Sequence, residues 1–262
     1  MKTVSDFAAA KAMGQKIAMV TAYDAAAARV IASSPVDCVL VGDSVMMVVH
    51  GEENTLGATP ELMALHTRAV ARGEPGKFIV ADMPFLAARK GLAPALDCAA
   101  ALLRAGAQAV KIEGVQGHVE VIRQLVESGI PVMGHLGLLP QSVHASSGFK
   151  VQARNATAAA QLREDAQTLV AAGVFALVLE CIPAKLAAAI TAELPVPTIG
   201  IGAGAGCDGQ VLVWHDLLGL NPEFKPRFVR QFGRGNKVLG TALADYAQAV
   251  HAGSFPARKE SF

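Results

Sequence analysis

Cys38-Val39-Leu40-Val41-Gly42-Asp43-Ser44 is the stretch of sequence that decides the fold. Four apolar residues lead to a glycine, and the run then ends at a carboxylate with a hydroxyl beside it. A strand buried on both faces has this pattern, and Asp43 then lies where the strand leaves the core. Similar apolar runs, each ending in a different polar residue, recur along the chain. This repetition predicts both the architecture and the position of a functional site.

The composition fits a large soluble core. The chain has 262 residues, of which 52% are hydrophobic and 17% charged, with a formal net charge of +1. These values suit one large domain or two small ones, and we expect a single domain covering residues 1–262. The near-neutral charge argues against a nucleic acid or an acidic membrane surface as the main partner.

The two remaining compositional signals concern location and redox state. The N-terminus lacks the apolar core of a signal peptide, and no run approaches about 18 apolar residues, so we expect a cytoplasmic protein. The four cysteines are far apart in the sequence, without a Cys-x-x-Cys pair. Buried free thiols are therefore expected, and a zinc or disulfide function is only weakly indicated.

Eight short apolar strands alternate with helices. The strands are predicted at residues 17–22, 38–41, 77–81, 109–113, 131–134, 175–179, 198–201 and 211–213. The helices are predicted at residues 5–13, 25–31, from 59 onward, 94–105, 119–127, 156–172 and 184–193, with two closing helices near 225–232 and 236–251. This order predicts an α/β (β/α)8 TIM barrel with a short N-terminal helix and an extra C-terminal helix. A doubly wound sheet is the rival, but the first turn, Thr21-Ala22-Tyr23-Asp24, has no glycines for binding a nucleotide.

Ionisable residues gather at the predicted strand ends, where a barrel of this kind builds its site. These residues are Tyr23, Asp24, Asp43, Asp82, Lys111, Glu113, His135, Glu180, His215 and Asp216. Any one of them has an ordinary structural explanation, such as a helix cap or an ion pair. Such explanations do not account well for six strands that end in the same way, because buried charge is costly unless it is paired or bound to a cation.

Asp43, Asp82 and Glu113 come from the second, third and fourth strands. Neighbouring strands lie about 4.8 Å apart, so the three carboxylates can reach one point. An all-oxygen ligand set favours a hard divalent cation, Mg2+ above Zn2+. Such a cation can chelate a 2-oxo acid and, as a Lewis acid, stabilise its enolate.

Three further residues have competing interpretations. Lys111 faces the same side of its strand as Glu113, so it either pairs with that carboxylate or binds a substrate oxygen. His135 is either a core histidine with its hydrogen bonds satisfied or a substrate contact. Glu180 is predicted to lie apart from the other carboxylates, which leaves it available as a general base.

Several motifs occur in the order typical of one known family. They are Val41-Gly42-Asp43-Ser44, His66-Thr67, Ala81-Asp82-Met83-Pro84-Phe85, Val110-Lys111-Ile112-Glu113-Gly114, Gly134-His135-Leu136-Gly137-Leu138 with Pro140-Gln141-Ser142, Leu177-Val178-Leu179-Glu180-Cys181-Ile182-Pro183 and Ile199-Gly200-Ile201-Gly202-Ala203-Gly204. From about Lys16 to the end, the chain closely resembles the ketopantoate (3-methyl-2-oxobutanoate) hydroxymethyltransferases.

This resemblance implies a Mg2+-dependent transfer from 5,10-methylenetetrahydrofolate to 3-methyl-2-oxobutanoate, giving 2-dehydropantoate in pantothenate biosynthesis. By the family pattern, Asp43, Asp82 and Glu113 hold the metal directly or through water, and Glu180 accepts the proton. Substrate contacts fall on Asp43, Ser44, Asp82, Lys111 and His135. The family also implies a homo-oligomer, a decamer of two pentameric rings.

The departures from the family pattern lie outside those positions. Val45-Met46 and the stretch 86–89 differ from the usual residues, so the loops after the second and third strands are expected to have a different shape. Tyr23, Asp24, His215 and Asp216 receive no role. The alternative function is a Mg2+-dependent lyase or mutase of the phosphoenolpyruvate-mutase kind, but no candidate lid cysteine follows the fourth strand. A non-catalytic barrel would have no reason to converge three carboxylates.

Overall fold

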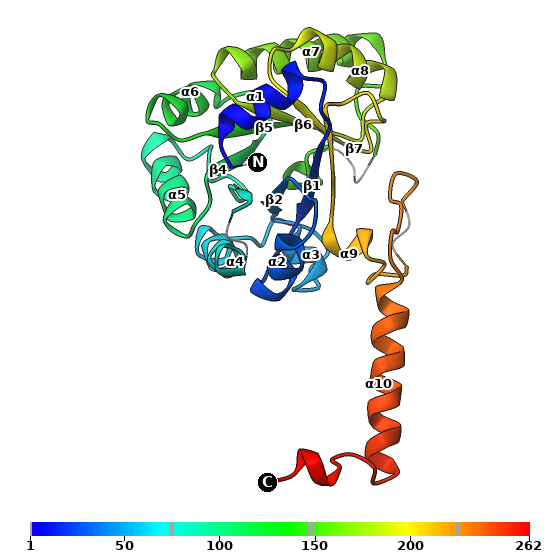
Figure 1. The fold of residues 1–262 in the computed structure, drawn as a ribbon. Coiled ribbons are helices and arrows are strands. Elements are labelled where there is room, and N and C mark those ends of the chain that lie inside the picture. Colours follow the sequence, from blue (N-terminus) through cyan, green and yellow to red (C-terminus); the bar gives the residue numbers. More distant parts are fainter. Residues whose placement is uncertain (1, 74–75, 146–147, 149, 224–225) are drawn as a thin grey trace. The chain divides into compact units, whose positions relative to one another are not determined.

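A computed structural model describes residues 2–73, 76–145, 148, 150–223 and 226–262. Its eight parallel strands form a closed barrel in chain order, with helices around the outside (Figure 1). The strands are β1 (Ile17–Thr21), β2 (Cys38–Val41), β3 (Phe78–Asp82), β4 (Ala109–Glu113), β5 (Val132–Gly137), β6 (Ala176–Glu180), β7 (Thr198–Ile201) and β8 (Gly209–Leu212). The predicted (β/α)8 TIM barrel is confirmed.

The helices follow the strands as expected for this fold. They are α1 (Val4–Ala12), α2 (Ala25–Ala32), α3 (Val45–Val48), α4 (Pro60–Gly73), α5 (Leu92–Arg104), α6 (Val119–Glu127), α7 (Ala156–Ala171), α8 (Ala184–Glu193), α9 (Trp214–Leu217) and α10 (Gly235–His251), with short 3-10 turns η1 (Pro140–Ser142) and η2 (Arg258–Glu260). No helix in the described ranges is both long and apolar enough to cross a membrane.

One predicted helix is wrong. Lys225, at its start, lies outside the described residues, and residues 226–232 contain one turn, at 227–228, and no helix. The backbone here bonds elsewhere: Val229 N donates to Pro226 O (3.0 Å), and Phe232 N donates to Leu217 O (2.8 Å). These bonds replace the i→i−4 ladder that a helix would need.

The barrel interior near the N-terminal strand ends is apolar and is closed by α1. Phe7 of α1 packs edge-to-face on Phe78 and on Phe175, with both ring-centroid distances 5.2 Å. Alternate strand residues point inward. Phe78 and Val80 of β3, and Ala109 of β4, belong to this core cluster. The same inward face therefore continues to the other end of each strand.

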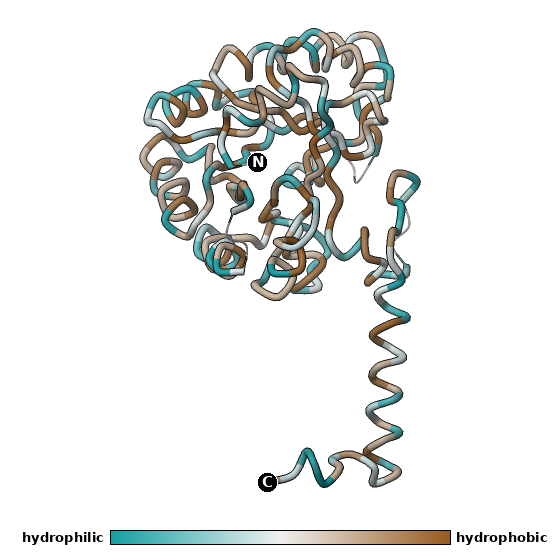
Figure 2. Tube along the Cα trace, in the orientation of Figure 1, coloured by the Kyte–Doolittle hydropathy of each residue, from teal (hydrophilic) through white to brown (hydrophobic). Residues whose placement is uncertain are grey.

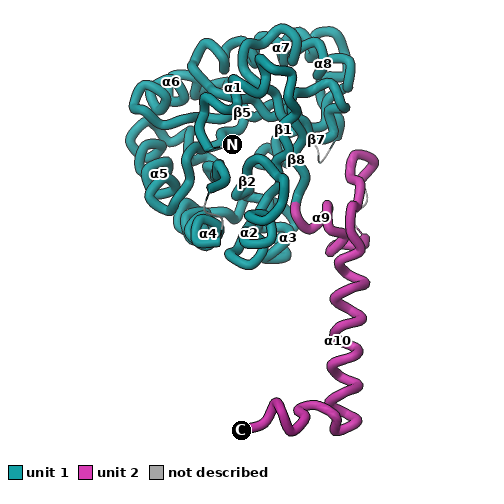
Figure 3. Tube along the Cα trace, viewed as in Figure 1, with its two compact units in different colours: residues 1–213 teal, residues 214–262 magenta. Residues whose placement is uncertain are grey.

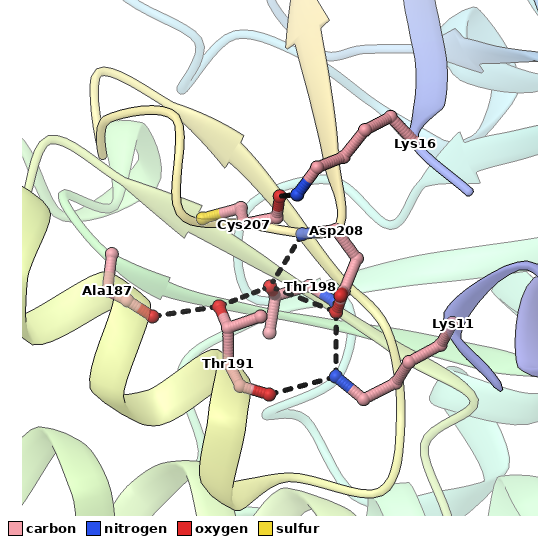
Figure 4. A network of polar contacts seen from close by, with 7 residues as sticks. All are labelled: Lys11, Lys16, Ala187, Thr191, Thr198, Cys207 and Asp208. Carbon is pink, nitrogen blue, oxygen red and sulfur yellow. Dashed lines mark hydrogen bonds and ion pairs between the residues drawn. The ribbon is translucent and has the colours of Figure 1, made fainter. Parts of the chain in front are cut away.

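A polar network ties α1 to the turn before β8 (Figure 4). Lys11 Nζ lies 2.8 Å from Asp208 Oδ2 and donates to Thr191 O at 2.9 Å. Asp208 also accepts from Thr198 N at 2.9 Å, and Lys16 Nζ donates to Cys207 O at 2.6 Å. The network is far from the C-terminal strand ends, so its role is to hold the helix in place.

The glycine-rich turn after β7 is explained by packing. A Cβ at Gly204, where φ is +79°, would lie 2.4 Å from Ala184 Cβ, and one at Gly206 would lie 2.6 Å from Ala188 Cβ. Only glycine lets α8 approach this turn so closely. All four cysteines are buried and free, as expected.

The chain separates into two compact units, residues 1–213 and 214–262 (Figure 3). The first unit contains the complete barrel. The second contains α9, α10 and η2, and hydrophobic and hydrophilic residues alternate along α10 (Figure 2). The single domain expected over residues 1–262 stays a prediction.

Candidate active site

The strand register brings five predicted site residues to one end of the barrel interior. Asp82 pairs with Lys111 across β3 and β4, Glu113 with His135 across β4 and β5, and Gly137 with Glu180 across β5 and β6. Asp82, Lys111, Glu113, His135 and Glu180 continue the inward face of the core by steps of two residues. Asp43 follows β2 directly. The alternation of side chains along each strand therefore creates the cluster.

Asp82 and Lys111 form the central ion pair. Lys111 Nζ lies 2.8 Å from Asp82 Oδ1, and both side chains are about 95% buried, with 5% and 4% exposed. Burial lowers the pKa of Lys111, but the charges of Asp82, Glu113 and Asp43 outweigh it and raise the pKa above the ordinary value. The ammonium therefore stays charged. The ion-pair partner of Lys111 is thus Asp82 rather than the predicted Glu113, and its contact with a substrate oxygen stays a prediction.

Asp43 lies in an excess of negative charge. Burial, then the charges of Asp82 and Glu113, raise the pKa of its carboxyl well above the ordinary value, although Lys111 and a hydrogen bond from Gln141 act in the opposite direction. Asp43 N donates to Asp82 Oδ2 at 3.0 Å, so the two residues are direct neighbours. One ammonium does not neutralise three carboxylates, and a further cation would relieve their repulsion.

The three predicted metal ligands do not form a ready-made cage. Among the described residues, no three His, Cys, Asp or Glu side chains converge closely enough to hold a metal by themselves. Mg2+ commonly takes only one or two protein carboxylates and keeps several waters. Neighbouring Asp43 and Asp82 suit that mode, and Glu113 Oε1, buried without a hydrogen-bond partner, suits a contact through water. The residues fit a magnesium ion of this kind.

His135 connects the ion pair to Glu180. Its Nδ1 lies 3.2 Å from Lys111 Nζ and 3.4 Å from Glu113 Oε1, and its Nε2 lies 3.1 Å from Glu180 Oε2. Burial and the Lys111 charge lower the pKa of His135, but the interactions with Glu113 and Glu180 outweigh them and raise it to about 8.

Glu180 differs from the other carboxylates in its exposure. Its side chain is 16% exposed, whereas those of Asp82 and Glu113 are 4% and 5% exposed. The next residue, Cys181, has φ +47°, a left-handed conformation that is rare for a residue other than glycine. The backbone bond from Cys181 N to Ile201 O, at 2.8 Å, helps to hold it there. Glu180 is therefore positioned by β6 and still reachable from the barrel mouth.

Ser44 is oriented by a residue to which the sequence assigned no role. Tyr23, 1% exposed, places its hydroxyl 2.8 Å from Ser44 Oγ. The backbone carbonyl of Tyr23 lies 2.7 Å from His66 Nδ1. Asp24, also unassigned, caps α2 by accepting from Ala27 N at 2.8 Å. His215 and Asp216 belong to α9, in the second unit.

Gln141 is a site residue that the sequence reasoning missed. Its Nε2 donates to Asp43 Oδ2 (2.8 Å) and to Met83 O (3.0 Å), and its backbone N donates to Glu113 Oε2 (3.1 Å). The available signal was the motif Pro140-Gln141-Ser142, which contributed to the family resemblance but received no role of its own.

A small hollow opens beside Glu113 and Gln141. It has a cavity volume of about 10 Å3, and its wall includes Met83, Arg89 and His118. His118 is 4% exposed, and burial lowers its pKa, so the ring is held neutral. The hollow borders the carboxylate cluster on the side of the loops that follow β3 and β4.

Comparison with known proteins gives the family. The sequence profile described as ketopantoate hydroxymethyltransferase matches residues 1–258. The 3-methyl-2-oxobutanoate hydroxymethyltransferase of Bdellovibrio bacteriovorus is 51% identical over 262 residues, covering 100% of both chains. The one from Legionella pneumophila is 50% identical over 260 residues, covering 99% of both.

Solved structures with lower identity share the fold. A phosphoenolpyruvate phosphomutase from Streptomyces platensis superposes with a TM-score of 0.64 at 13% identity, covering 95% of this chain and 88% of that one. A 2,3-dimethylmalate lyase of the PEP mutase/isocitrate lyase superfamily gives a TM-score of 0.59 at 16% identity, covering 96% and 87%. These matches concern the barrel alone, whereas the full-length matches above carry the assignment: the chain is an enzyme that belongs to the ketopantoate hydroxymethyltransferase family.

Proposed function

We propose that this enzyme transfers a one-carbon unit from 5,10-methylenetetrahydrofolate to 3-methyl-2-oxobutanoate, giving 2-dehydropantoate and tetrahydrofolate in pantothenate biosynthesis. The observation that carries the proposal is a row of four side chains at the barrel mouth. Asp82, Lys111, His135 and Glu180 follow one another at 2.8, 3.2 and 3.1 Å. A fixed cation and a reachable carboxylate are thereby held in one site.

The proposed metal is Mg2+, held by Asp43 and Asp82 with Glu113 acting through water. When bound, it would supply Lewis-acid polarisation of the 2-oxo group. The raised pKa of Asp43 supports this assignment, because burial and the charges of Asp82 and Glu113 disfavour a third ionised carboxylate in the absence of a counterion.

Lys111, Ser44 and His135 are the proposed substrate contacts, together with Asp43 and Asp82. Lys111 stays charged and is buried, so its attraction for a substrate carboxylate or for a developing enolate oxygen is little screened by water. The Ser44 hydroxyl is oriented by Tyr23. His135, with its pKa raised to about 8, is a donor at neutral pH and can hydrogen-bond the same oxygens.

Glu180 is the proposed proton acceptor. The C3–H of the keto acid is a weak acid, and the enolate left by its loss needs the positive charge of Lys111 nearby. The C3 proton passes to the Glu180 carboxylate, which is the most exposed of the acids in the row. Water adds to the methylene carbon of the folate iminium, and the bond from that carbon to the folate nitrogen breaks, which releases tetrahydrofolate and leaves formaldehyde at the barrel mouth. C3 then attacks the formaldehyde carbon, and the formaldehyde oxygen takes up a proton to become the hydroxyl of the hydroxymethyl group.

We further propose that the chain acts in the cytoplasm as a homo-oligomer, a decamer by analogy with the family. The apolar residues of α10 support association. Leu239, Leu243 and Tyr246 are 55, 69 and 57% exposed, and in the described part of the chain this helix has no buried residue.

Proton exchange at C3 tests the proposed base. In deuterated buffer with Mg2+ and without folate, we expect the wild-type enzyme to exchange the C3–H of 3-methyl-2-oxobutanoate, as followed by NMR. Glu180→Gln should abolish exchange while leaving Mg2+ affinity unchanged. Glu193→Gln, at the exposed end of α8, is the matched control and should exchange normally. Exchange at the wild-type rate in Glu180→Gln would remove Glu180 from this role.

The alternative, a lyase or mutase of the phosphoenolpyruvate-mutase kind, is not favoured. Proteins of that kind match this chain at only 13–16% identity in the two comparisons above, against about 50% for the hydroxymethyltransferases. The cysteines also lie in the wrong places for a lid nucleophile, because all four are buried.

A further inference from the structure

Gln141 touches the ends of three successive strands. It lies in η1, after β5, and reaches Asp43 beyond β2, Met83 beyond β3 and Glu113 at the end of β4. Those are the three strand ends that supply the proposed metal ligands.

The orientation of the Gln141 side chain follows from its partners. Asp43 Oδ2 and Met83 O are both acceptors, at 2.8 and 3.0 Å, so the amide must turn its NH2 group toward them. Both amide protons are then committed. The bond to Asp43 is charge-assisted and therefore among the stronger kinds of hydrogen bond.

These contacts restrict the two carboxylates that they join. Asp43 and Glu113 are 4 and 8% exposed, so little water is present to orient them. The side chain of Gln141 holds Oδ2 of Asp43, and its backbone N–H holds Oε2 of Glu113. Glu113 Oε1 is left without a hydrogen-bond partner. One oxygen of each carboxylate is thus fixed by Gln141, and the second oxygen of Glu113, Oε1, lies 3.4 Å from His135 Nδ1.

We propose that Gln141 is a positioning residue for the divalent cation: it fixes the rotation of the Asp43 carboxylate and links it to Glu113, so that both present an oxygen to the same ion. The inference rests on the proposed function, since that function supplies the cation. Gln141 itself is not a ligand, because its NH2 group is the part turned toward the carboxylate.

The test is the affinity for Mg2+ alone, measured by calorimetry on the full-length protein after treatment with a chelator. Gln141→Met keeps the length of the side chain and the backbone N–H but removes both amide donors. Loss of a group that orients a ligand typically weakens metal binding 10- to 100-fold, and we expect a loss in this range. At saturating Mg2+, turnover by the variant should recover, so the defect appears in the Mg2+ requirement rather than in kcat.

The matched control is Gln116→Met. Gln116 also donates from Nε2 to an aspartate, Asp165 Oδ1 at 2.6 Å, but on the outer surface of the barrel. Its replacement should leave Mg2+ affinity unchanged. If circular dichroism shows that Gln141→Met does not fold, Gln141→Asn serves instead. The asparagine side chain is shorter by one carbon, so its amide is drawn back from Asp43, and the affinity for Mg2+ should also fall.

Two results would overturn the inference, and they differ in meaning. A Gln141 variant that binds Mg2+ within twofold of the wild type removes the positioning role and leaves the proposed function intact. A wild-type protein that binds no Mg2+ at millimolar concentration removes the cation assignment, and this inference with it.

Discussion

At the residue scale, the site depends on charges that the fold keeps out of water. Lys111 is surrounded by Asp43, Asp82 and Glu113, and those three carboxylates outweigh the effect of burial on its pKa. A buried charge without partners would cost several kcal/mol. Because Asp82 lies 2.8 Å away, the ammonium is stable in place, and its contact with an anionic substrate oxygen stays a proposal.

Tyr23 acts at the same scale through Ser44. Tyr23→Phe removes the hydroxyl that lies 2.8 Å from Ser44 Oγ and leaves the ring in place. One net hydrogen bond contributes about 0.5–1.5 kcal/mol, which corresponds to a roughly 2- to 10-fold change. We expect KM for 3-methyl-2-oxobutanoate to rise by this factor with little change in kcat, as measured by steady-state kinetics.

Tyr246→Phe is the control for this variant, since Tyr246 is 57% exposed on α10. It should have the KM of the wild-type enzyme. An unchanged KM for the keto acid in Tyr23→Phe would mean that Ser44 needs no orientation by Tyr23.

At the scale of elements, glycines set how closely helices and strands approach. Gly209 begins β8, and a Cβ there would lie 2.5 Å from Ile17 O on β1. The close approach explains why β8 starts at a residue that carries no strand signal: Gly209 and Gln210 pair with Ile17 and Ala18. The strand predicted at residues 211–213 overlaps only the apolar end of β8.

The glycine-rich turn after β7 gives a prediction at this scale. Gly204→Ala introduces a methyl 2.4 Å from Ala184 Cβ, at φ +79°. The left-handed conformation costs about 1–2 kcal/mol for alanine, and overpacking adds about 1–3 kcal/mol. We expect the free energy of urea-induced unfolding to fall by the sum of the two.

Gly14→Ala separates these contributions. Gly14 has φ +66° and nothing within 4 Å of the added methyl, so only the backbone cost applies. Equal destabilisation of Gly14→Ala and Gly204→Ala would show that close packing of α8 on the turn contributes nothing.

At the scale of the whole molecule, α10 carries an apolar stripe that no described residue of its own unit buries. Leu239, Leu243, Tyr246 and Val250 follow a helical spacing of three and four residues and are 42–69% exposed. We expect the wild-type chain to form an oligomer well above 27.1 kDa, as measured by light scattering after size exclusion.

Leu243→Asp tests whether this stripe is the interface. A charge in the middle of the stripe should convert the oligomer to a smaller species, because an unpaired carboxylate is costly to bury. Gln248→Asp, on the opposite side of the helix, should leave the mass unchanged. The interpretation is contradicted if the wild type is a monomer, or if Leu243→Asp retains the wild-type mass.

Much of the fold could be predicted from the sequence, because the spacing of apolar residues and the residues that end helices and strands act locally. The strands at 109–113 and 198–201, and the helices at 119–127 and 184–193, were predicted with the bounds that the structure has. The helix near 225–232 was wrong, because the backbone at Val229 and Phe232 bonds to Pro226 and Leu217 instead of forming a ladder. A local pattern does not record which distant carbonyl a backbone N–H reaches.

The sequence by itself determined that apolar strands end in acids, a lysine and a histidine, and these motifs led to the family. Only the tertiary structure decided which of those groups touch. Lys111 pairs with Asp82 rather than with Glu113, Tyr23 orients Ser44, and Gln141 joins Asp43 to Glu113. The reason is geometric: the strand register and the loop after β5 bring together residues as much as 98 positions apart, and spacing along the chain does not encode those distances.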